Sequence, residues 1–164
     1  MNEFDLDLLR ADRVGLDEAL FCAGKTSAQI NRIVETMATA SRPMLLTRLD
    51  EGRHGALDAG VRSLLHYDPV SRTAVLGARR ELRAAARVAV VCAGTSDLPV
   101  SREAVRTLEY YGETVSEFND VGVAGLHRLL SRLEDIRAHE VQPARGRRIT
   151  PLEASPERKR RRAR

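Results

Sequence analysis

The chain has 164 residues, of which 43% are hydrophobic and 30% are charged, which is enough for one compact domain or two small ones. No apolar run approaches the ~20 residues that a membrane-spanning helix needs, so a membrane protein is excluded and a soluble protein is expected. The net charge of +4 comes from residues 142–164, which carry nine basic and two acidic side chains. Residues 1–141 have a net charge of −3, so the positive charge lies in a terminal run and not on a folded face, and nucleic acid is an unlikely partner.

The amino-terminal part of the chain predicts a strand followed by a helix. Residues 1–9 favour a helix or disorder, and a charged turn containing Arg13 follows them. Residues 16–23 predict a short strand. The next helix has apolar side chains at helical spacing, namely Ile30, Ile33, Val34 and Met37.

The junction between this strand and helix contains Gly24, Lys25 and Thr26. A P-loop would need a glycine five residues before Gly24, where the chain has Ala19, so we reject a nucleoside-triphosphatase motif. Thr26 and Gln29 have the spacing of a capping box. Lys25 is then either an anion contact beside a helix N-terminus or an ordinary surface lysine.

Residues 43–86 predict the rest of a first domain. A strand is expected over residues 43–48, a helix over 51–65 and a short strand over 73–76. His54 and His66 have no second metal ligand at helical spacing, so surface or packing roles are favoured and no metal site is predicted. Residues 77–86 favour helix and read as a connector. We expect a first domain over residues 1–77, a connector over 78–86 and a second domain over 87–141.

The second domain opens with a strand, a polar loop and a helix. Residues 88–93 are a continuous apolar run, as in a parallel strand that is buried on both faces. Gly94 ends the run, and three short oxygen-bearing side chains follow, those of Thr95, Ser96 and Asp97. The next helix is expected to be N-capped by Ser101, to turn Val105, Leu108 and Tyr111 toward the sheet, and to end at Gly112.

A second strand, loop and helix follow directly. Residues 114–118 predict the strand, and residues 119–125 the loop, which includes Asp120. His127 and Arg128 lie in the first turn of the helix after it. Two consecutive β-α units imply right-handed crossovers, so both loops should open on one edge of the sheet. A histidine there can relay protons, and a guanidinium can grip phosphate.

The two cysteines and the carboxyl-terminal segment carry further signals. Cys22 and Cys92 each lie in an apolar run without CxxC spacing, which indicates packing in a reduced cytoplasmic compartment. Residues 142–164 have almost no apolar side chains, so a disordered basic tail is expected. Such a tail leaves open a non-catalytic protein that binds nucleic acid or another partner.

Several spaced segments resemble one known family. Residues 93–100 (AGTSDLPV) and 120–129 (DVGVAGLHRL) are similar to signature segments of LarB, the pyridinium biscarboxylate mononucleotide synthase. That family is itself similar to PurE, the aminoimidazole ribonucleotide carboxylase or mutase of purine synthesis. Residues 13–15 (RVG), and 23–26 (AGKT) with 44–48 (MLLTR), resemble the LarB amino-terminal region, which PurE lacks.

The resemblance implies a fold and a reaction. The fold would be a small amino-terminal α/β domain, then the first half of a flavodoxin-like, PurE-like parallel domain. LarB-like enzymes carboxylate the pyridinium ring of nicotinic acid adenine dinucleotide with carbon dioxide and hydrolyse its phosphoanhydride, releasing AMP, in nickel-pincer cofactor synthesis. The resemblance also implies a homo-oligomer and a possible Mg²⁺ ion, although no cofactor is evident in the sequence. PurE-type purine synthesis is the alternative enzymatic interpretation.

The resemblance also assigns roles to residues. It implies that Thr95, Ser96, Asp97 and Asp120 line a ribonucleotide site, that Arg128 holds phosphate, and that His127 sits beside the reacting ring. Asp97 and His127 are the expected catalytic residues, and Lys25 and Arg13 are further expected anion contacts. The family's nucleophilic cysteine has no counterpart in Cys22 or Cys92. The resemblance fails after Val141, where LarB-like and PurE-like proteins continue with a long apolar strand that this sequence lacks. We therefore expect a truncated or frameshifted, inactive form.

Overall fold

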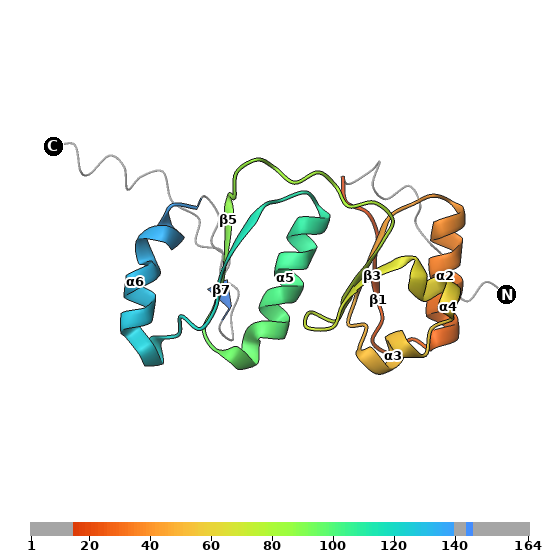
Figure 1. Cartoon of the computed structure of the whole chain (residues 1–164), viewed down its shortest axis with the longest axis horizontal. Helices are drawn as coiled ribbons and strands as arrows, with labels where there is room; N and C mark the ends of the chain where they lie inside the picture. The colour runs from red at the N-terminus through yellow and green to blue at the C-terminus, as the bar shows by residue number, and fades with distance from the viewer. Residues whose placement is uncertain (1–14, 140–143, 146–164) are drawn as a thin grey trace. The chain divides into compact units, whose positions relative to one another are not determined.

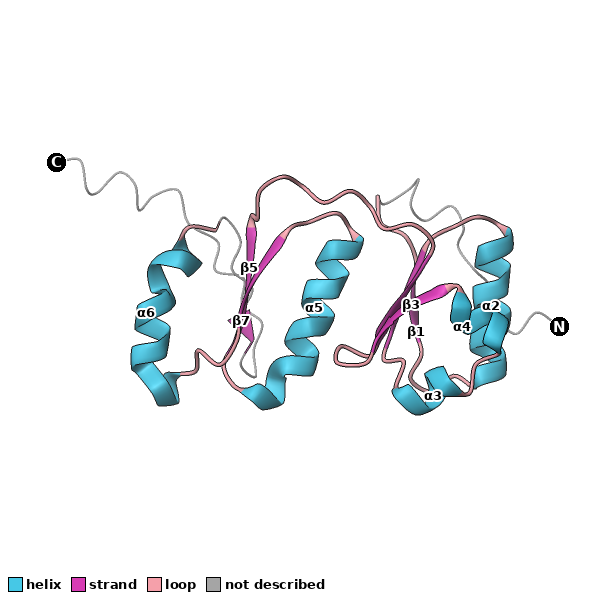
Figure 2. Cartoon of the chain, viewed as in Figure 1, coloured by secondary structure: helices cyan, strands magenta, loops and turns pink. Residues whose placement is uncertain are grey.

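The computed structural model describes residues 15–139 and 144–145, and the chain divides into two compact units. Unit 1 comprises residues 15–81 together with Tyr110–Gly112 (Figure 1). Unit 2 comprises residues 82–109 and the described residues from 113 onward. Each unit pairs a small sheet with helices, so the α/β class expected from the sequence is confirmed (Figure 2).

Unit 1 contains a four-stranded mixed sheet in the order β1-β2-β4-β3. β1 runs parallel to β2, whereas β4 is antiparallel to both β2 and β3. The elements of this unit are β1 (Ala19–Phe21), α2 (Ser27–Thr39), β2 (Met44–Thr47), α3 (Glu51–Gly55), α4 (Ala59–Ser63), β3 (Leu65–Asp68) and β4 (Thr73–Leu76).

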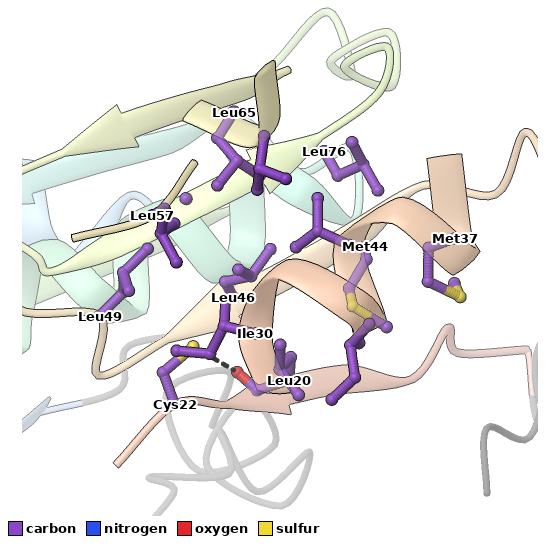
Figure 3. Close-up of a cluster of buried hydrophobic side chains, with 14 residues drawn as sticks. Leu20, Cys22, Ile30, Met37, Met44, Leu46, Leu49, Leu57, Leu65 and Leu76 are labelled. Atoms are coloured by element: carbon purple, nitrogen blue, oxygen red, sulfur yellow. Dashed lines mark hydrogen bonds between the residues drawn. The ribbon is translucent and has the colours of Figure 1, made fainter. Parts of the chain in front are cut away.

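Side chains of alternating strand residues build the core of unit 1. Leu20 pairs in register with Leu46, and both point to the face that the apolar stripe of α2 covers. Figure 3 shows this cluster, with Ile30 and Met37 of α2 packed over the sheet residues. The intervening residue Leu45 belongs instead to a small cluster with Val75, Tyr110 and Tyr111.

The capping box that the sequence predicts for α2 is confirmed. The backbone amide of Gln29 donates to Thr26 Oγ1 (3.2 Å), and the amide of Thr26 donates to Gln29 Oε1 (3.0 Å). Two amide groups at the helix start are thereby satisfied by side chains. The capping box thus fixes the N-terminus of α2 next to Lys25.

The prediction of one helix over residues 51–65 is wrong. Two short helices, α3 and α4, replace it, and the strand β3, which was not predicted, follows. Three glycines in this segment lower its helix propensity, and the break lets Leu57 turn into the core between the helices, where it is 3% exposed. The expected helical bias of residues 77–86 is also absent, because these residues have no regular secondary structure.

Unit 2 contains a parallel sheet in the order β6-β5-β7. Its elements are β5 (Val88–Cys92), a short 3-10 turn (Thr95–Asp97), α5 (Leu98–Tyr110), β6 (Val115–Phe118), a second 3-10 turn (Val123–Gly125), α6 (Leu126–Arg137) and β7 (Ala144–Arg145). Val88, Val90 and Val115 of the sheet pack against Val105 and Leu108 of α5. Figure 1 shows α5 and α6 on opposite faces of this sheet.

Two expectations for this region are wrong. Ser101 is not an N-cap, because α5 already begins at Leu98, and Ser101 is buried within the helix. The 3-10 turn runs directly into the helix, and Pro99 fits a first helical turn because its missing amide is not needed there. Tyr111 packs with the Leu45 cluster of unit 1 rather than with Val105 and Leu108.

A third parallel strand is present where the sequence predicted a disordered tail. Ala144 and Arg145 form β7 and pair with Val91 and Cys92 of β5. Backbone hydrogen bonding does not require apolar side chains, so this pairing left no signal in the sequence. The described residues do not include the rest of that predicted tail. They also do not include residues 1–9 or Arg13. None of the described helices is both long and apolar enough to cross a membrane.

Candidate functional site at the carboxyl edge of unit 2

The strand order of unit 2 creates a topological switch point. The chain passes from β5 through α5 to β6 on one side, and then through α6 to β7 on the other side of β5. The loops after β5 and β6 therefore lie at one edge of the sheet, where their connections lead to opposite faces (Figure 2). Open parallel sheets bind ligands in the crevice at such a point.

The loop after β5 carries the first group of predicted site residues. Thr95 and Ser96 are exposed, and Asp97 is half-buried. The Asp97 amide donates to the Gly94 carbonyl (3.0 Å), which forms the turn that leads into α5. The buried Cys92 thiol donates to the same carbonyl (3.0 Å). The loop thus presents hydroxyl and carboxylate groups beside the N-terminus of a 13-residue helix.

The loop after β6 packs directly against the end of β5. The Val121 amide donates to the Cys92 carbonyl (3.1 Å). A Cβ atom on Gly122 would lie only 2.4 Å from the Ala93 carbonyl oxygen, so only glycine permits this approach. Asp120 immediately before it has a φ of +58°, in the left-handed region that Asp tolerates better than most residues.

Arg128 and Asp120 are in direct contact. The Arg128 guanidinium donates through Nη1 to Asp120 Oδ2, and the two side chains are 45% and 46% exposed. The guanidinium lies over the backbone of Gly125, where an added Cβ would be 2.4 Å from Nε. His127 is exposed in the same turn of α6. The structure therefore brings Asp120 and Arg128 together, with His127 adjacent in the chain.

The remaining predicted site residues, Lys25 and Arg13, are not part of this group of loops. Lys25 is half-buried in unit 1, where its amide donates to the Cys22 carbonyl (3.1 Å) at the start of α2. Burial raises the pKa of the neighbouring Cys22 thiol to about 11, although the positive charges of Lys25 and Arg53 oppose this shift. Cys22 is fully buried, in agreement with a packing role. Arg13 lies outside the described residues.

A polar group below the two loops was missed in the sequence. Arg102 in α5 donates to Glu117 Oε2 of β6 (3.2 Å). Glu117 Oε1 and the Ser101 hydroxyl are buried and have no hydrogen-bond partner among the described residues. The available signal was a glutamate in a β-favouring run two residues before a predicted site loop. These groups can accept or donate hydrogen bonds close to the carboxyl end of β6.

Comparison with known proteins finds a family match for the amino-terminal part of the chain. Residues 1–80 match the family model described as the LarB/PurE-like N-terminal domain. The chain is also similar to an uncharacterized protein of Methanocaldococcus jannaschii, with 28% identity over 141 residues. This match covers 83% of the chain and 55% of the archaeal protein, so the chain spans about half the length of that relative.

Proposed function

Because residues 1–80 match a LarB/PurE-like N-terminal domain, and this match relates the chain to a carboxylase family, we propose that the chain carries the nucleotide site of a LarB-like enzyme. The substrates are nicotinic acid adenine dinucleotide and carbon dioxide. The reaction carboxylates the pyridinium ring, hydrolyses the phosphoanhydride and releases AMP, as a step in nickel-pincer cofactor synthesis. The archaeal relative is uncharacterized, so this proposal rests on the domain family and on the site itself.

One observation carries the proposal. Two loops that follow parallel strands meet at the switch point of unit 2, as the Val121–Cys92 hydrogen bond and the close approach of Gly122 to Ala93 demonstrate. They present an acceptor-rich group and a guanidinium, which are the side chains that a nucleotide's ribose and phosphate require.

Each side chain of these loops has a proposed role. The hydroxyl groups of Thr95 and Ser96 donate hydrogen bonds to phosphate or ribose oxygens, and the Asp97 carboxylate accepts hydrogen bonds from ribose hydroxyl groups. Arg128 binds phosphate through its planar fork, which can donate two parallel hydrogen bonds. His127, exposed beside it, moves protons at the reacting ring near neutral pH.

A magnesium ion, a homo-oligomer and a cytoplasmic location belong to the same proposal. The described residues gather no group of three or more metal-ligating side chains. Mg²⁺ usually binds through one or two carboxylates together with phosphate oxygens and water, so Asp97 with a bound nucleotide fits such an ion. It would neutralise phosphate charge.

The test is calorimetric titration with nicotinic acid adenine dinucleotide. Arg128→Ala should weaken binding by ~1.5–3 kcal/mol, because a charge-assisted hydrogen bond to phosphate is lost. Arg132→Ala is the matched control: Arg132 lies one turn further along α6, is 60% exposed and pairs with Asp135 (3.8 Å). The control should bind the dinucleotide like the parent.

A second titration separates the two enzymatic candidates. Aminoimidazole ribonucleotide carries a phosphate and a ribose but no pyridinium ring, so PurE-type function predicts that it binds more tightly than the dinucleotide. The LarB-like proposal predicts the reverse order. Equal affinity of Arg128→Ala and the parent for both nucleotides would refute the site.

A further inference from the structure

Asp120 places an anion on the guanidinium that the proposed function assigns to phosphate. Its carboxylate accepts from Arg128 Nη1, and both groups belong to the loop and helix that follow β6. A nucleotide phosphate that uses this guanidinium must therefore compete with a carboxylate of the same chain. The Asp120–Arg128 contact should therefore lower the affinity of the site for phosphate, besides holding the loop to the helix.

The strength of this contact makes exchange feasible. With 45% and 46% of the two side chains exposed, water screens the ion pair. Exposed pairs of this kind typically favour the paired state by a factor of only about two to five. Inorganic phosphate carries more charge than a carboxylate, and the diphosphate of a dinucleotide carries two negative charges and more acceptor oxygens, so either can displace Asp120 from Arg128.

The backbone holds both partners at this place. Asp120 has a φ of +58°, which directs its side chain from a tight turn at the end of β6. Gly125 leaves room for the Arg128 guanidinium to lie directly over the loop backbone. The pair thus keeps Arg128 at the loop rather than extended into solvent.

We propose that Asp120 is an internal competitor of phosphate: its carboxylate holds the Arg128 guanidinium at the loop and is displaced when the phosphate group of a nucleotide binds. This inference rests on the proposed function and changes the role of Asp120. The sequence suggested a residue that contacts the nucleotide directly. The geometry instead assigns Asp120 to Arg128.

The test removes the charge of Asp120 and keeps its backbone. Asp120→Asn is suitable because Asn also tolerates a positive φ, and Asp120→Gly is a second variant with the same tolerance. Each variant is titrated with inorganic phosphate and with nicotinic acid adenine dinucleotide at low and moderate salt. We expect both probes to bind about two- to five-fold more tightly than to the parent, with a smaller gain at moderate salt.

Two controls isolate the contact. Asp135→Asn removes one negative charge from an exposed Asp–Arg pair on the same helix, so it measures the general effect of net charge. The gain in affinity should be absent in Asp135→Asn and in the double variant Asp120→Asn with Arg128→Ala.

The outcomes distinguish this inference from the proposed function. Unchanged or weaker binding by both Asp120 variants, or an equal gain in Asp135→Asn, would overturn the competitor role while leaving the site intact. If Arg128→Ala alone binds both probes like the parent, the nucleotide site itself is wrong. A gain in affinity that appears in Asp120→Asn and disappears in the double variant with Arg128→Ala supports both the competitor role of Asp120 and the nucleotide site.

Discussion

At the scale of single residues, His54 illustrates how partial burial affects the charge of a histidine side chain. Its ring stacks on that of Tyr67, with centroids 3.9 Å apart and an interplanar angle of 12°. His54 Nε2 and the Tyr67 hydroxyl are both buried and have no hydrogen-bond partner among the described residues. The cost of desolvating such groups favours the neutral imidazole.

Unit 1 should therefore lose stability in mild acid. Burial lowers the pKa of His54 from its usual value of 6.5, the charge of Arg62 acts in the same direction, and Glu51 opposes them. The unfolded chain then takes up the proton first, so stability that is complete above about pH 6.5 falls as the pH drops toward the folded-state pKa. Urea denaturation at about pH 7.5 and 5.5 measures this loss.

The substitution His54→Phe keeps an aromatic stack and removes the titrating group. It should flatten the pH dependence between these two conditions. His66→Phe, at an exposed position of β3 in the same unit, is the control and should retain the parent's response. A His54→Phe variant that loses as much stability in acid as the parent would contradict the explanation.

At the scale of elements, Gly122 and Gly125 in the loop after β6 differ in what surrounds them. Gly122 and Gly125 both have negative φ angles, −71° and −122°, so neither is required for backbone conformation. A Cβ on Gly122 would collide with the backbone of Ala93, whereas a Cβ on Gly125 would meet only the flexible end of Arg128. A backbone neighbour cannot move away as a side chain can.

We predict that Gly122→Ala lowers the free energy of unfolding of unit 2 by ~1–3 kcal/mol, because the loop after β6 is pushed off the end of β5. Gly125→Ala should cost less than ~1 kcal/mol, since Arg128 can rotate aside. Denaturant titration of both variants measures the difference. Equal losses would show that the close approach to Ala93 is unimportant.

At the scale of the whole molecule, charge and the candidate site are separated along the sequence. Residues 146–164 hold eight of the 27 basic side chains and two of the 23 acidic ones. Without them the chain would have a formal net charge of −2. A basic run of this kind binds duplex DNA through released counterions, and that affinity falls steeply with salt.

Deleting residues 146–164 should eliminate any salt-dependent binding of duplex DNA. The affinity for nicotinic acid adenine dinucleotide should stay within about two-fold of the parent, because none of the proposed nucleotide contacts lies in the deleted segment and salt weakens long-range effects of charge. Fluorescence anisotropy with labelled DNA and calorimetry with the dinucleotide measure the two effects. Strong DNA binding by a parent chain that binds no nucleotide would favour the non-catalytic alternative.

The sequence by itself determined those features whose signals are local. The β-branched run of β5, the Thr26–Gln29 capping box and the polar loop that contains Asp97 all reflect preferences of neighbouring residues, and the structure has them where they were predicted. The match of residues 1–80 to a LarB/PurE-like N-terminal domain agrees with the resemblance that short motifs indicated. The roles of His127, Asp97 and the other site residues remain predictions.

Only the tertiary structure decided the features that depend on contacts between distant residues. The break between α3 and α4 accompanies the burial of Leu57, and β7 forms by pairing with β5, which is distant in the sequence. The pairing of Asp120 with Arg128 requires the turn at Asp120 and the open backbone at Gly125. Local preferences amount to a few tenths of a kcal/mol per residue, so burial and backbone pairing override them wherever they conflict.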